Sequence, residues 1–505
     1  MSTRGDDPGA EKSSGEMNPI NTTIIDVESK LSEKENDSPS AHIDPAAEKR
    51  LLWKLDLTIF PILYIVYMMS FLDRINISNA RIQGLPKDID LSGNRFNIAL
   101  FVYFIPYILL EVPSNMLIRR VRPSWYLGGL MFCWGIINMC MGFIKTYEAL
   151  VVLRFFLGVF EAGVLPGIIY LTSMYYKRHE YQTRMSFLFS STLVGGAFGG
   201  LLAYGIAHLD GQKGYAAWRW IFIIEGAITA VIALVSIFLI VDWPEQCQFL
   251  STSEKDLLKR RLAADGNETC RMDNLNGFAY KLIFSDYKIW LGSLIYMGIG
   301  TTGYATTFFM PTILLEFQWT AASAQVHTIP VYVVSAAGML LAAWASDRLK
   351  QRYVFILLGS IIATIGYGIL LGQAGLSRDT KYAAVFLICL GGYIATPIAL
   401  AWLANNVSGH WKRSFGSGLQ ITLGNIAGII GANIFLTTEQ PRYPTGYGTA
   451  FGMLWMGTLA ATAMYFLMRR ENLKRDAGER DSRLNQPVEE VSNMGDHHPS
   501  FRFTL

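Results

Sequence analysis

Among the ionisable residues that lie in or beside long apolar stretches of this sequence, six are best suited to chemistry. They are Asp73, Arg74, Arg154, Glu161, Arg219 and Glu225. An ionised side chain at the centre of a membrane helix costs at least about 2.5–3.5 kcal/mol, so such residues usually face a cavity or a partner. A buried carboxyl group can bind and release a proton, and a guanidinium group can hold a carboxylate through two parallel hydrogen bonds.

Three carboxyl groups are candidates for proton binding. Glu161 lies at the middle of the fourth apolar stretch, and an ion pair with Arg154 or Arg219 is its alternative role. Asp73 lies late in the first stretch, where it and its neighbour Arg74 could instead compensate each other. For Glu225, which lies a turn or two from Arg219, a polar network with Arg219 that stabilises the fold is favoured over proton binding.

The candidates for binding a substrate are polar residues in or near the same stretches. Arg74 is the first choice for an anionic substrate, and Arg219 is the second. Tyr304 could offer a ring face and a hydroxyl group to a small ring compound. The remaining candidates are amides that could bind either a ligand or a neighbouring helix, namely Asn76, Asn405 and Asn406.

The elements that must position these residues are apolar stretches of membrane-spanning length. The composition is 51% hydrophobic and 16% charged, with a mean hydropathy of +0.28, whereas a soluble domain carries about 25% charged residues. Stretches of about 20 apolar residues are long enough to cross a bilayer. No stretch shows the short alternation of a membrane β-barrel, so we expect α-helices throughout.

The apolar stretches fall into two groups of six, separated by a polar interval. The first lie near 57–72, 96–118, 125–144, 149–171, 186–207 and 218–240, and the second near 289–314, 326–345, 354–371, 383–403, 415–436 and 451–468. The fifth and eleventh stretches are both rich in glycine, which lets helices pack closely. The predicted fold is therefore an all-α membrane protein with twelve transmembrane helices in two pseudo-symmetric six-helix bundles.

The expected organisation has five parts. A disordered N-terminal tail covers 1–56, the bundles cover 57–240 and 288–470, a linker covers 241–287, and a disordered C-terminal tail covers 471–505. Ser251 and Glu254 resemble a capping box that begins a short helix in the linker. Lys and Arg gather in alternate loops, which predicts that both termini are cytoplasmic.

Several classes of function are excluded by the same sequence. A net charge of +3 gives no basic face for nucleic acid. The cysteines lack metal-ligand or disulfide spacing, so we expect no metal site. No phosphate-binding loop and no set of catalytic groups is present, so we expect neither a cofactor nor an enzyme. The expected partners are a lipid bilayer, protons and a small organic anion, and the expected functional unit is a monomer.

Two motifs connect the chain to a known superfamily. In the fourth stretch Arg154, Gly158, Ala162 and Pro166 recur every four residues, so they share one helix stripe. The loop after the eighth stretch contains Asp347 and Arg348, within Ala343–Arg352. These motifs resemble the fourth-helix signature and the cytoplasmic gate of the major facilitator superfamily, although the matching loop of the first half lacks the aspartate.

A finer resemblance is to the fungal anion:cation symporter (allantoate permease) family, and nearest in pattern to nicotinate permeases. It spans about Lys54 to Phe466 and is carried by blocks at 71–76, 160–163, 218–226, 405–413 and 441–443. The resemblance implies a transporter in the plasma membrane that couples protons to the uptake of a nicotinate-, allantoate- or pantothenate-like carboxylate.

An exporter of a secondary metabolite or toxic small molecule is the alternative function. Drug–proton antiporters of the superfamily usually carry a Gly-Pro pair in the fifth helix, and the segment Gly195–Gly200 has no proline. A nutrient sensor that has lost transport is a third possibility. Sensors of this kind often have long cytoplasmic extensions, and the tails here are short.

Overall fold

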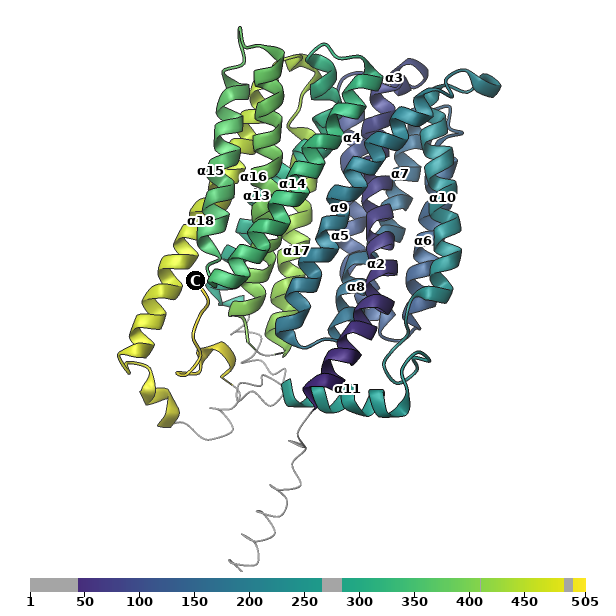
Figure 1. Ribbon diagram of the computed structural model, residues 1–505. Coiled ribbons are helices and arrows are strands. Elements are labelled where there is room, and N and C mark those ends of the chain that lie inside the picture. The colour runs from purple at the N-terminus through teal and green to yellow at the C-terminus, as the bar shows by residue number, and fades with distance from the viewer. Residues whose placement is uncertain (1–43, 266–283, 409, 486–493) are drawn as a thin grey trace, which may run out of the picture.

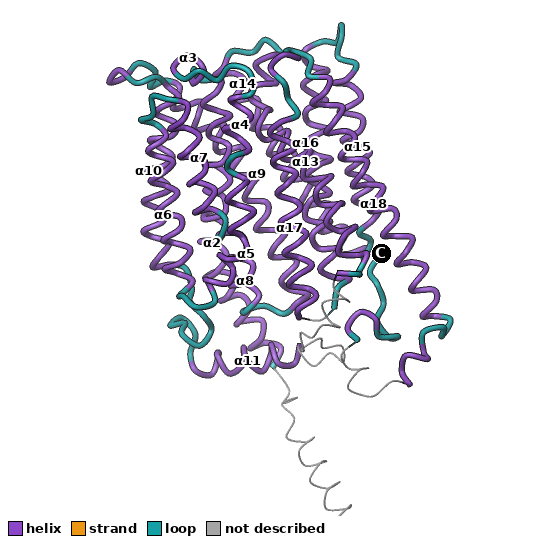
Figure 2. Tube along the Cα trace, turned by 180° about the vertical axis from the view of Figure 1, so that it is seen from behind, coloured by secondary structure: helices purple, strands orange, loops and turns teal. Residues whose placement is uncertain are grey.

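The computed structural model describes residues 44–265, 284–408, 410–485 and 494–505, and regular structure within these ranges is entirely helical. Most helices run side by side along one direction, whereas the short helix α11 (Thr252–Asp265) lies across one end of them (Figures 1 and 2). We call this end the α11 end. The opposite end carries α3 (Leu85–Asp88) and is called the α3 end.

The first group of helices spans residues 45–239. Its members are α2 (Pro45–Ile82), α3, α4 (Arg95–Phe101), α5 (Phe104–Ile118), α6 (Pro123–Met141), α7 (Tyr147–Glu161), α8 (Val164–Ser173), α9 (Arg178–Ala207) and α10 (Ala217–Leu239), with the 3₁₀ turn η1 (Gln212–Gly214) before α10. The pairs α4–α5 and α7–α8 each continue as one length of helix with a short break. The break between α7 and α8 follows immediately after Glu161, the last residue of α7.

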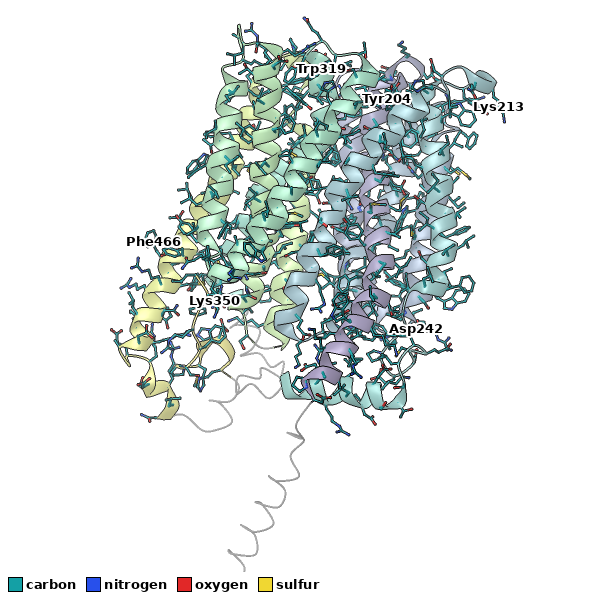
Figure 3. All side chains as sticks on the ribbon, in the orientation of Figure 1. Tyr204, Lys213, Asp242, Trp319, Lys350 and Phe466 are labelled. Atoms are coloured by element: carbon teal, nitrogen blue, oxygen red, sulfur yellow. The ribbon has the colours of Figure 1, made fainter. Side chains whose placement is uncertain are left out.

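The second group lies beside the first in Figure 1. It comprises α13 (Tyr287–Glu316), α14 (Ala321–Leu349), α15 (Tyr353–Leu371), α16 (Arg378–Asn406), α17 (His410–Asn433) and α18 (Pro444–Asp476), with the 3₁₀ turns η2 (Thr437–Glu439), η3 (Asp481–Asn485) and η4 (Gly495–His497). Trp319 and Lys350, labelled in Figure 3, flank α14 at the α3 end and the α11 end.

Within the described ranges, nine helical segments are long and apolar enough to cross a membrane. Large apolar side chains cover the outside of the bundle; Phe238, for example, is 86% exposed. Such a surface suits lipid, and helices satisfy their own backbone hydrogen bonds there. The prediction of an all-α membrane protein is confirmed. Three more long helices, α6, α13 and α17, lie in the same bundle, and the count of twelve spans stays a prediction.

Glycines allow the two groups to meet closely. On α9, a Cβ atom at Gly196 would lie 2.8 Å from the ring of Tyr332 of α14, and one at Gly200 would lie 2.9 Å from the carbonyl oxygen of Gln325. On α17, a Cβ atom at Gly428 would overlap the ring of Phe104 of α5. The glycine-rich stretches seen in the sequence therefore lie at the boundary between the groups, where small residues permit close packing.

The linker helix begins as its sequence predicts. The Ser251 hydroxyl accepts a hydrogen bond from the Glu254 amide at 3.3 Å, and the Glu254 carboxylate accepts one from the Ser251 amide at 2.8 Å. Two ion pairs tie α11 to α2, Lys54–Glu254 at 2.8 Å and Arg261–Glu48 at 2.8 Å.

The helices extend beyond the boundaries predicted for the two tails. Helix α2 begins at Pro45, capped by Asp44, and α18 continues to Asp476, so both reach into segments predicted to be disordered. Residues 494–505, which we call the C-terminal strap, pack against the second group. Phe503 is buried, and its backbone exchanges hydrogen bonds with the side chain of Asn472 at 2.9 Å. The other parts of the predicted tails and linker, 1–43, 266–283 and 486–493, lie outside the described residues.

Candidate functional site

A buried ion pair joins α2 and α7 at the middle of the first group. The Arg74 guanidinium group donates to the Glu161 carboxylate, and both side chains are almost fully buried. Ser70, one turn earlier on α2, donates to the same carboxylate oxygen at 2.5 Å. The guanidinium carbon of Arg74 also lies 5.2 and 5.4 Å from the ring centroids of Tyr103 and Tyr107. Arg74 is thus held by one anion and two aromatic rings.

Arg154 lies two turns before Glu161 on α7 but does not form the ion pair considered from the sequence. Its Nη1 atom donates to the backbone carbonyl of Arg74 at 3.4 Å. Its Nε and Nη2 atoms are buried and have no hydrogen-bond partner among the described residues. Buried donors are rarely left unpaired, so these two atoms offer a place for an anion or water.

Asp73 faces away from Arg74, because neighbouring residues of a helix point about 100° apart. Its carboxylate accepts hydrogen bonds from Trp134 Nε1 at 3.0 Å, Asn138 Nδ2 at 2.6 Å and Thr229 Oγ1 at 2.7 Å. Asn76 adds a weaker contact at 3.4 Å. These donors join α2 to α6 and α10, so Asp73 is the centre of a network that binds three helices.

Glu225 on α10 is fully buried, and neither carboxylate oxygen has a hydrogen-bond partner in the part of the chain that the structure describes. Asp73 and Asn76 are its polar neighbours. The predicted network with Arg219 is not present. Arg219 lies at the α3 end, where its Nη1 atom donates to the carbonyls of Gly142 and Ile144 and its Nε atom lies 3.4 Å from Asp88.

Tyr304 on α13 extends the polar centre into the second group. Its hydroxyl group donates to Asn425 of α17 at 3.1 Å, and its ring contacts Phe104 of α5 at 5.2 Å. Asn425 and Thr422 in turn donate to Glu111 of α5, each at 3.4 Å. A chain of contacts thus crosses the boundary between the two groups of helices.

Glu111 and Asn425 were missed by the sequence analysis. Glu111 is the one carboxylate in the apolar stretch 96–118, and that isolation was the signal that could have found it. Asn425 is one amide in a glycine-rich helix, and nothing in its neighbourhood distinguishes it from a packing residue.

The remaining predicted residues lie at the α11 end or support packing. Asn406 exchanges hydrogen bonds with the backbone of Thr504 in the C-terminal strap, at 2.8 and 3.0 Å. Asn405 beside it is half-buried. In the gate motif Asp347 pairs with Arg352 at 2.6 Å, and Arg348 lies 5.7 Å from the ring of Trp344.

Two residues of the fourth-helix motif serve packing. A Cβ atom at Gly158 would overlap the backbone carbonyl oxygen of Tyr103, so only glycine fits there. Pro166 is buried in α8 just after the break that follows Glu161. Both residues therefore set the position of the helix that carries Glu161.

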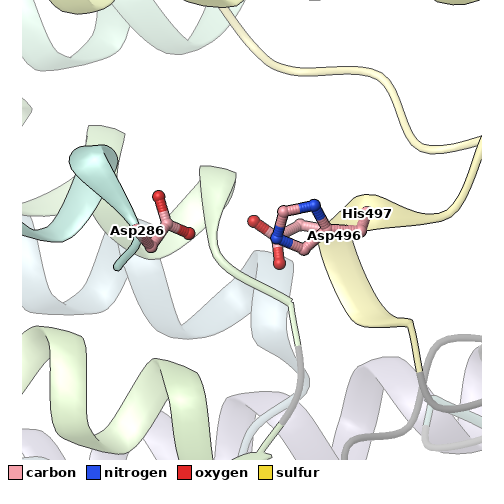
Figure 4. Close-up of side chains that lie close together, drawn as sticks. All are labelled: Asp286, Asp496 and His497. Atoms are coloured by element: carbon pink, nitrogen blue, oxygen red, sulfur yellow. The ribbon is translucent and has the colours of Figure 1, made fainter. Parts of the chain in front are cut away.

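A second buried cluster lies at the α11 end, where Figure 4 shows Asp286 facing Asp496 and His497 of the strap. Their ligand atoms lie within 4.8 Å of one another, as in a metal site. Two ammonium groups already occupy this cluster. Lys288 lies 2.9 Å from Asp286 and 2.6 Å from Asp496, and Lys412 contacts both carboxylates. We therefore interpret it as an ion-pair cluster that holds the strap.

The surroundings of this cluster determine the protonation states of Asp496 and His497 in the strap. Burial alone would raise the pKa of Asp496, but Lys288 and Lys412 lower it below its usual value. Burial lowers the pKa of His497 to about 4, so the imidazole is neutral when the strap is docked at pH 7.

The buried charges are divided unequally between the two groups of helices. Among the described residues, those at mid-bundle belong to the first group, and they are Asp73, Arg74, Glu111, Arg154, Glu161 and Glu225. The second group faces them with neutral residues, including Tyr304 and Asn425. Apolar helices in two groups, with charged side chains buried at mid-bundle, are typical of a membrane carrier.

The chain belongs to the Major Facilitator Superfamily, whose sequence profile matches residues 63–432. It is 34% identical to an uncharacterized transporter of Schizosaccharomyces pombe over 93% of this chain and 92% of that protein. It is 30% identical to the high-affinity nicotinic acid transporter of Saccharomyces cerevisiae, over 90% of this chain and 85% of that one. The protein is a multi-pass membrane transporter of a small molecule, and not an enzyme.

The fold is also that of solved transporters. The crystal structure of a D-xylose–proton symporter matches with a TM-score of 0.63 at 15% identity, over 82% of this chain and 97% of that one. At this identity the likeness concerns the fold alone. It confirms the prediction of the major facilitator fold.

Proposed function

We propose that the protein couples protons to the uptake of a small organic anion, of the nicotinate-, allantoate- or pantothenate-like class, by alternating access. It belongs, in this proposal, to the fungal anion:cation symporter (allantoate permease) family, acts as a monomer in the plasma membrane and has both termini in the cytoplasm. The observation that carries the proposal is the buried Arg74–Glu161 ion pair between Tyr103 and Tyr107.

The ion pair supplies a coupling mechanism. While Glu161 is ionised, it occupies the guanidinium group of Arg74. A proton on Glu161 removes the negative charge, and Arg74 then needs another anion, because an unpaired buried charge is costly. A substrate carboxylate meets this need and can bind through two parallel hydrogen bonds. Proton and anion therefore bind together, and neither is carried alone.

The aromatic surroundings favour a planar substrate. Tyr103 and Tyr107 lie against the guanidinium group on the first group of helices, and Tyr304 contributes a ring from the second. Rings at such positions stack on a flat ligand and add about 0.5–1.5 kcal/mol per aromatic contact. The relative named for nicotinic acid, a planar aromatic carboxylate, supports this class of cargo.

The other candidates take supporting roles in this proposal. Asp73 and Asn76 connect α2 with its neighbours, and Glu225 stays protonated, since no described cation offsets its charge. Asn405, Asn406 and the Asp347–Arg352 pair lie at the α11 end, where they would change partners as that end opens and closes. Arg219 stabilises the α3 end through Asp88.

The test is uptake of labelled nicotinate, allantoate and pantothenate by cells that lack their own permeases, with and without an uncoupler. We expect at least one acid to accumulate, and the uncoupler to abolish its accumulation. Accumulation that survives the uncoupler contradicts proton coupling. Failure of every acid, with the protein correctly inserted, favours the exporter, and loss of preloaded compounds from the same cells then measures it.

A further inference from the structure

We propose that Glu111 is a second proton-binding group, and that its protonation favours the conformation in which the α3 end is closed. The inference rests on the proposed function for its role in transport. The conformational part can be measured without any substrate.

The location of Glu111 is the first argument. It lies on α5 of the first group, and both of its hydrogen-bond partners, Thr422 and Asn425, lie on α17 of the second. Its contacts therefore exist only while these two helices are together. Seven residues before Glu111 on the same side of α5, Phe104 packs on Gly428 of α17, so one seam of contacts runs along both helices.

At the α3 end the two groups of helices contact each other in this structure, an arrangement that we call closed, and the seam is part of these contacts. Gln83 of the first group donates to Gln325 of the second at 2.8 Å, and Asn97 donates to the carbonyl of Phe435 at 3.3 Å. Both bonds lie towards the α3 end relative to Glu111. Opening of this end requires α5 and α17 to separate, and separation exposes the Glu111 carboxyl group to water.

The chemical surroundings of Glu111 are the second argument. The side chain is 4% exposed, and no described cation lies within ion-pair distance. The titratable groups that face it are Tyr107 of α5 and Tyr296 and Tyr304 of α13. From α17 it meets only an amide and a hydroxyl group. Arg154 and Glu161 of α7 face Arg74 instead.

If Glu111 were ionised in this position, no nearby positive charge of a described residue would compensate its negative charge. Burial of an unpaired charge is far more costly than burial of a hydrogen-bonded carboxylic acid. The conformation with a closed α3 end therefore stabilises the protonated form of Glu111. When this end is open, contact with water stabilises the ionised form. By linkage, a proton taken up at the open end drives closure.

Two coupled protons have a consequence for transport. If Glu111 also releases its proton when the α11 end is open, two protons accompany each monovalent anion bound at Arg74, and each cycle moves one net positive charge. A membrane potential of 100 mV then contributes about 2.3 kcal/mol to accumulation. With Glu161 alone the same cycle is electroneutral.

The test is the distance between the two groups of helices at the α3 end. Spin labels are attached at Lys145, in the turn between α6 and α7, and at Ala374, in the turn between α15 and α16, after the five native cysteines are replaced. Both positions are exposed, and neither lies on α5 or α17. Pulsed electron paramagnetic resonance in detergent or nanodiscs then gives distances between pH 5 and 9.

We expect the population with the longer distance to rise with pH, by at most about tenfold per pH unit for one proton. Glu111→Gln keeps a neutral hydrogen-bonding side chain, so the short distance should persist at every pH. Asn425→Ala removes a partner on α17 and should lengthen the distance at every pH. Glu148→Gln, at an exposed carboxylate on α7, is the matched control and should titrate like the unmodified chain.

Two results would overturn the inference. One is the same pH dependence in the Glu111→Gln variant as in the unmodified chain. The other is a distance that does not change with pH in the unmodified chain. Failure of acid uptake, by contrast, leaves these distances unaffected, so the two proposals fail separately.

Discussion

At the scale of single residues, the proposed coupling of proton and anion depends on Arg74 and the groups that compete for it. Its carboxylate partner Glu161, which also accepts a hydrogen bond from Ser70, and two tyrosine rings surround its guanidinium group, and Arg74 as a whole is 6% exposed. Lysine keeps the charge but has no planar fork, so it cannot hold a carboxylate through two parallel hydrogen bonds.

For Arg74→Lys we expect the affinity for the transported acid to fall roughly 10–100-fold, because one charge-assisted hydrogen bond contributes about 1.5–3 kcal/mol. The concentration dependence of initial uptake measures this change. An Arg50→Lys variant, at an exposed position at the start of α2, serves as control. Unchanged affinity in Arg74→Lys would remove this residue from the binding site.

For Glu161→Gln we expect accumulation against a gradient to be lost while exchange of labelled for unlabelled substrate is retained. The amide resembles the protonated acid, so the anion can bind Arg74 but no proton is released with it. Concentrative uptake and counterflow distinguish the two activities. Normal accumulation in this variant would exclude Glu161 as the coupling residue.

The sequence could identify some of these residues but not their partners. Arg74 and Glu161 stood out because charges are rare in apolar helices. Their pairing depends on how α2 and α7 face each other, which no local pattern encodes. Adjacent charges at Asp73 and Arg74 suggested a pair, yet the helical turn directs them to different neighbours. Arg219 was placed in the wrong polar environment, although it is the second residue of the stretch 218–240 and so lies at the start of α10, about two turns from Glu225.

At the scale of elements, the glycine stripes determine how the two groups of helices approach each other. The sequence predicted these stripes and their close packing, and the structure places them at the boundary between the groups. The breaks within α4–α5 and α7–α8 were not predicted, because the apolar pattern continues through them. The C-terminal strap was also missed, since a polar tail gives no local sign that distant lysines pair with its aspartate.

For Gly200→Ala we expect slower uptake with normal insertion, because the new Cβ atom would lie 2.9 Å from the carbonyl oxygen of Gln325 on α14. This contact hinders closure of the α3 end, and overpacking of this kind typically costs about 1–3 kcal/mol. Gly205→Ala on the same helix is the matched control, since no described atom beyond the backbone of its own helix lies within 4 Å of its Cβ position. Equal uptake rates in the two variants would contradict a close boundary at Gly200.

At the scale of the whole molecule, the strap connects the end of α18 to the starts of α13 and α17. Arg475 donates to the backbone carbonyls of Asp496 and Phe501, at 3.0 and 2.7 Å, and Asp496 pairs with Lys288 and Lys412. The second group of helices is therefore joined at the α11 end by contacts outside the spans. Because rigid groups are what alternating access requires, the strap supports their movement as one body.

We expect the strap to undock as the pH falls from 7.5 to 5. The pKa of His497 is lowered from its usual value of 6.5 to about 4 in the docked strap. Between these values the undocked strap binds more protons, so docking weakens as the pH falls. The lowered pKa of Asp496 acts only below its usual value of 3.8 and does not oppose this change.

Hydrogen exchange at the amides of Phe503 and Thr504, corrected for the intrinsic effect of pH, measures docking, because both amides donate to side chains of the helices. Protection should fall at pH 5 in the unmodified chain and change much less in His497→Asn. Equal loss of protection in both chains would show that His497 does not control docking.

Coupling between the proton and the anion at Arg74 and Glu161 is tested most directly in proteoliposomes with an imposed pH gradient. The acid that cells take up is supplied at equal concentration on both sides, with the outside acidic, and protein-free vesicles correct for passive entry. We predict accumulation inside vesicles that contain the unmodified chain, and none above the protein-free level with Glu161→Gln. Equal accumulation with both chains would contradict the account.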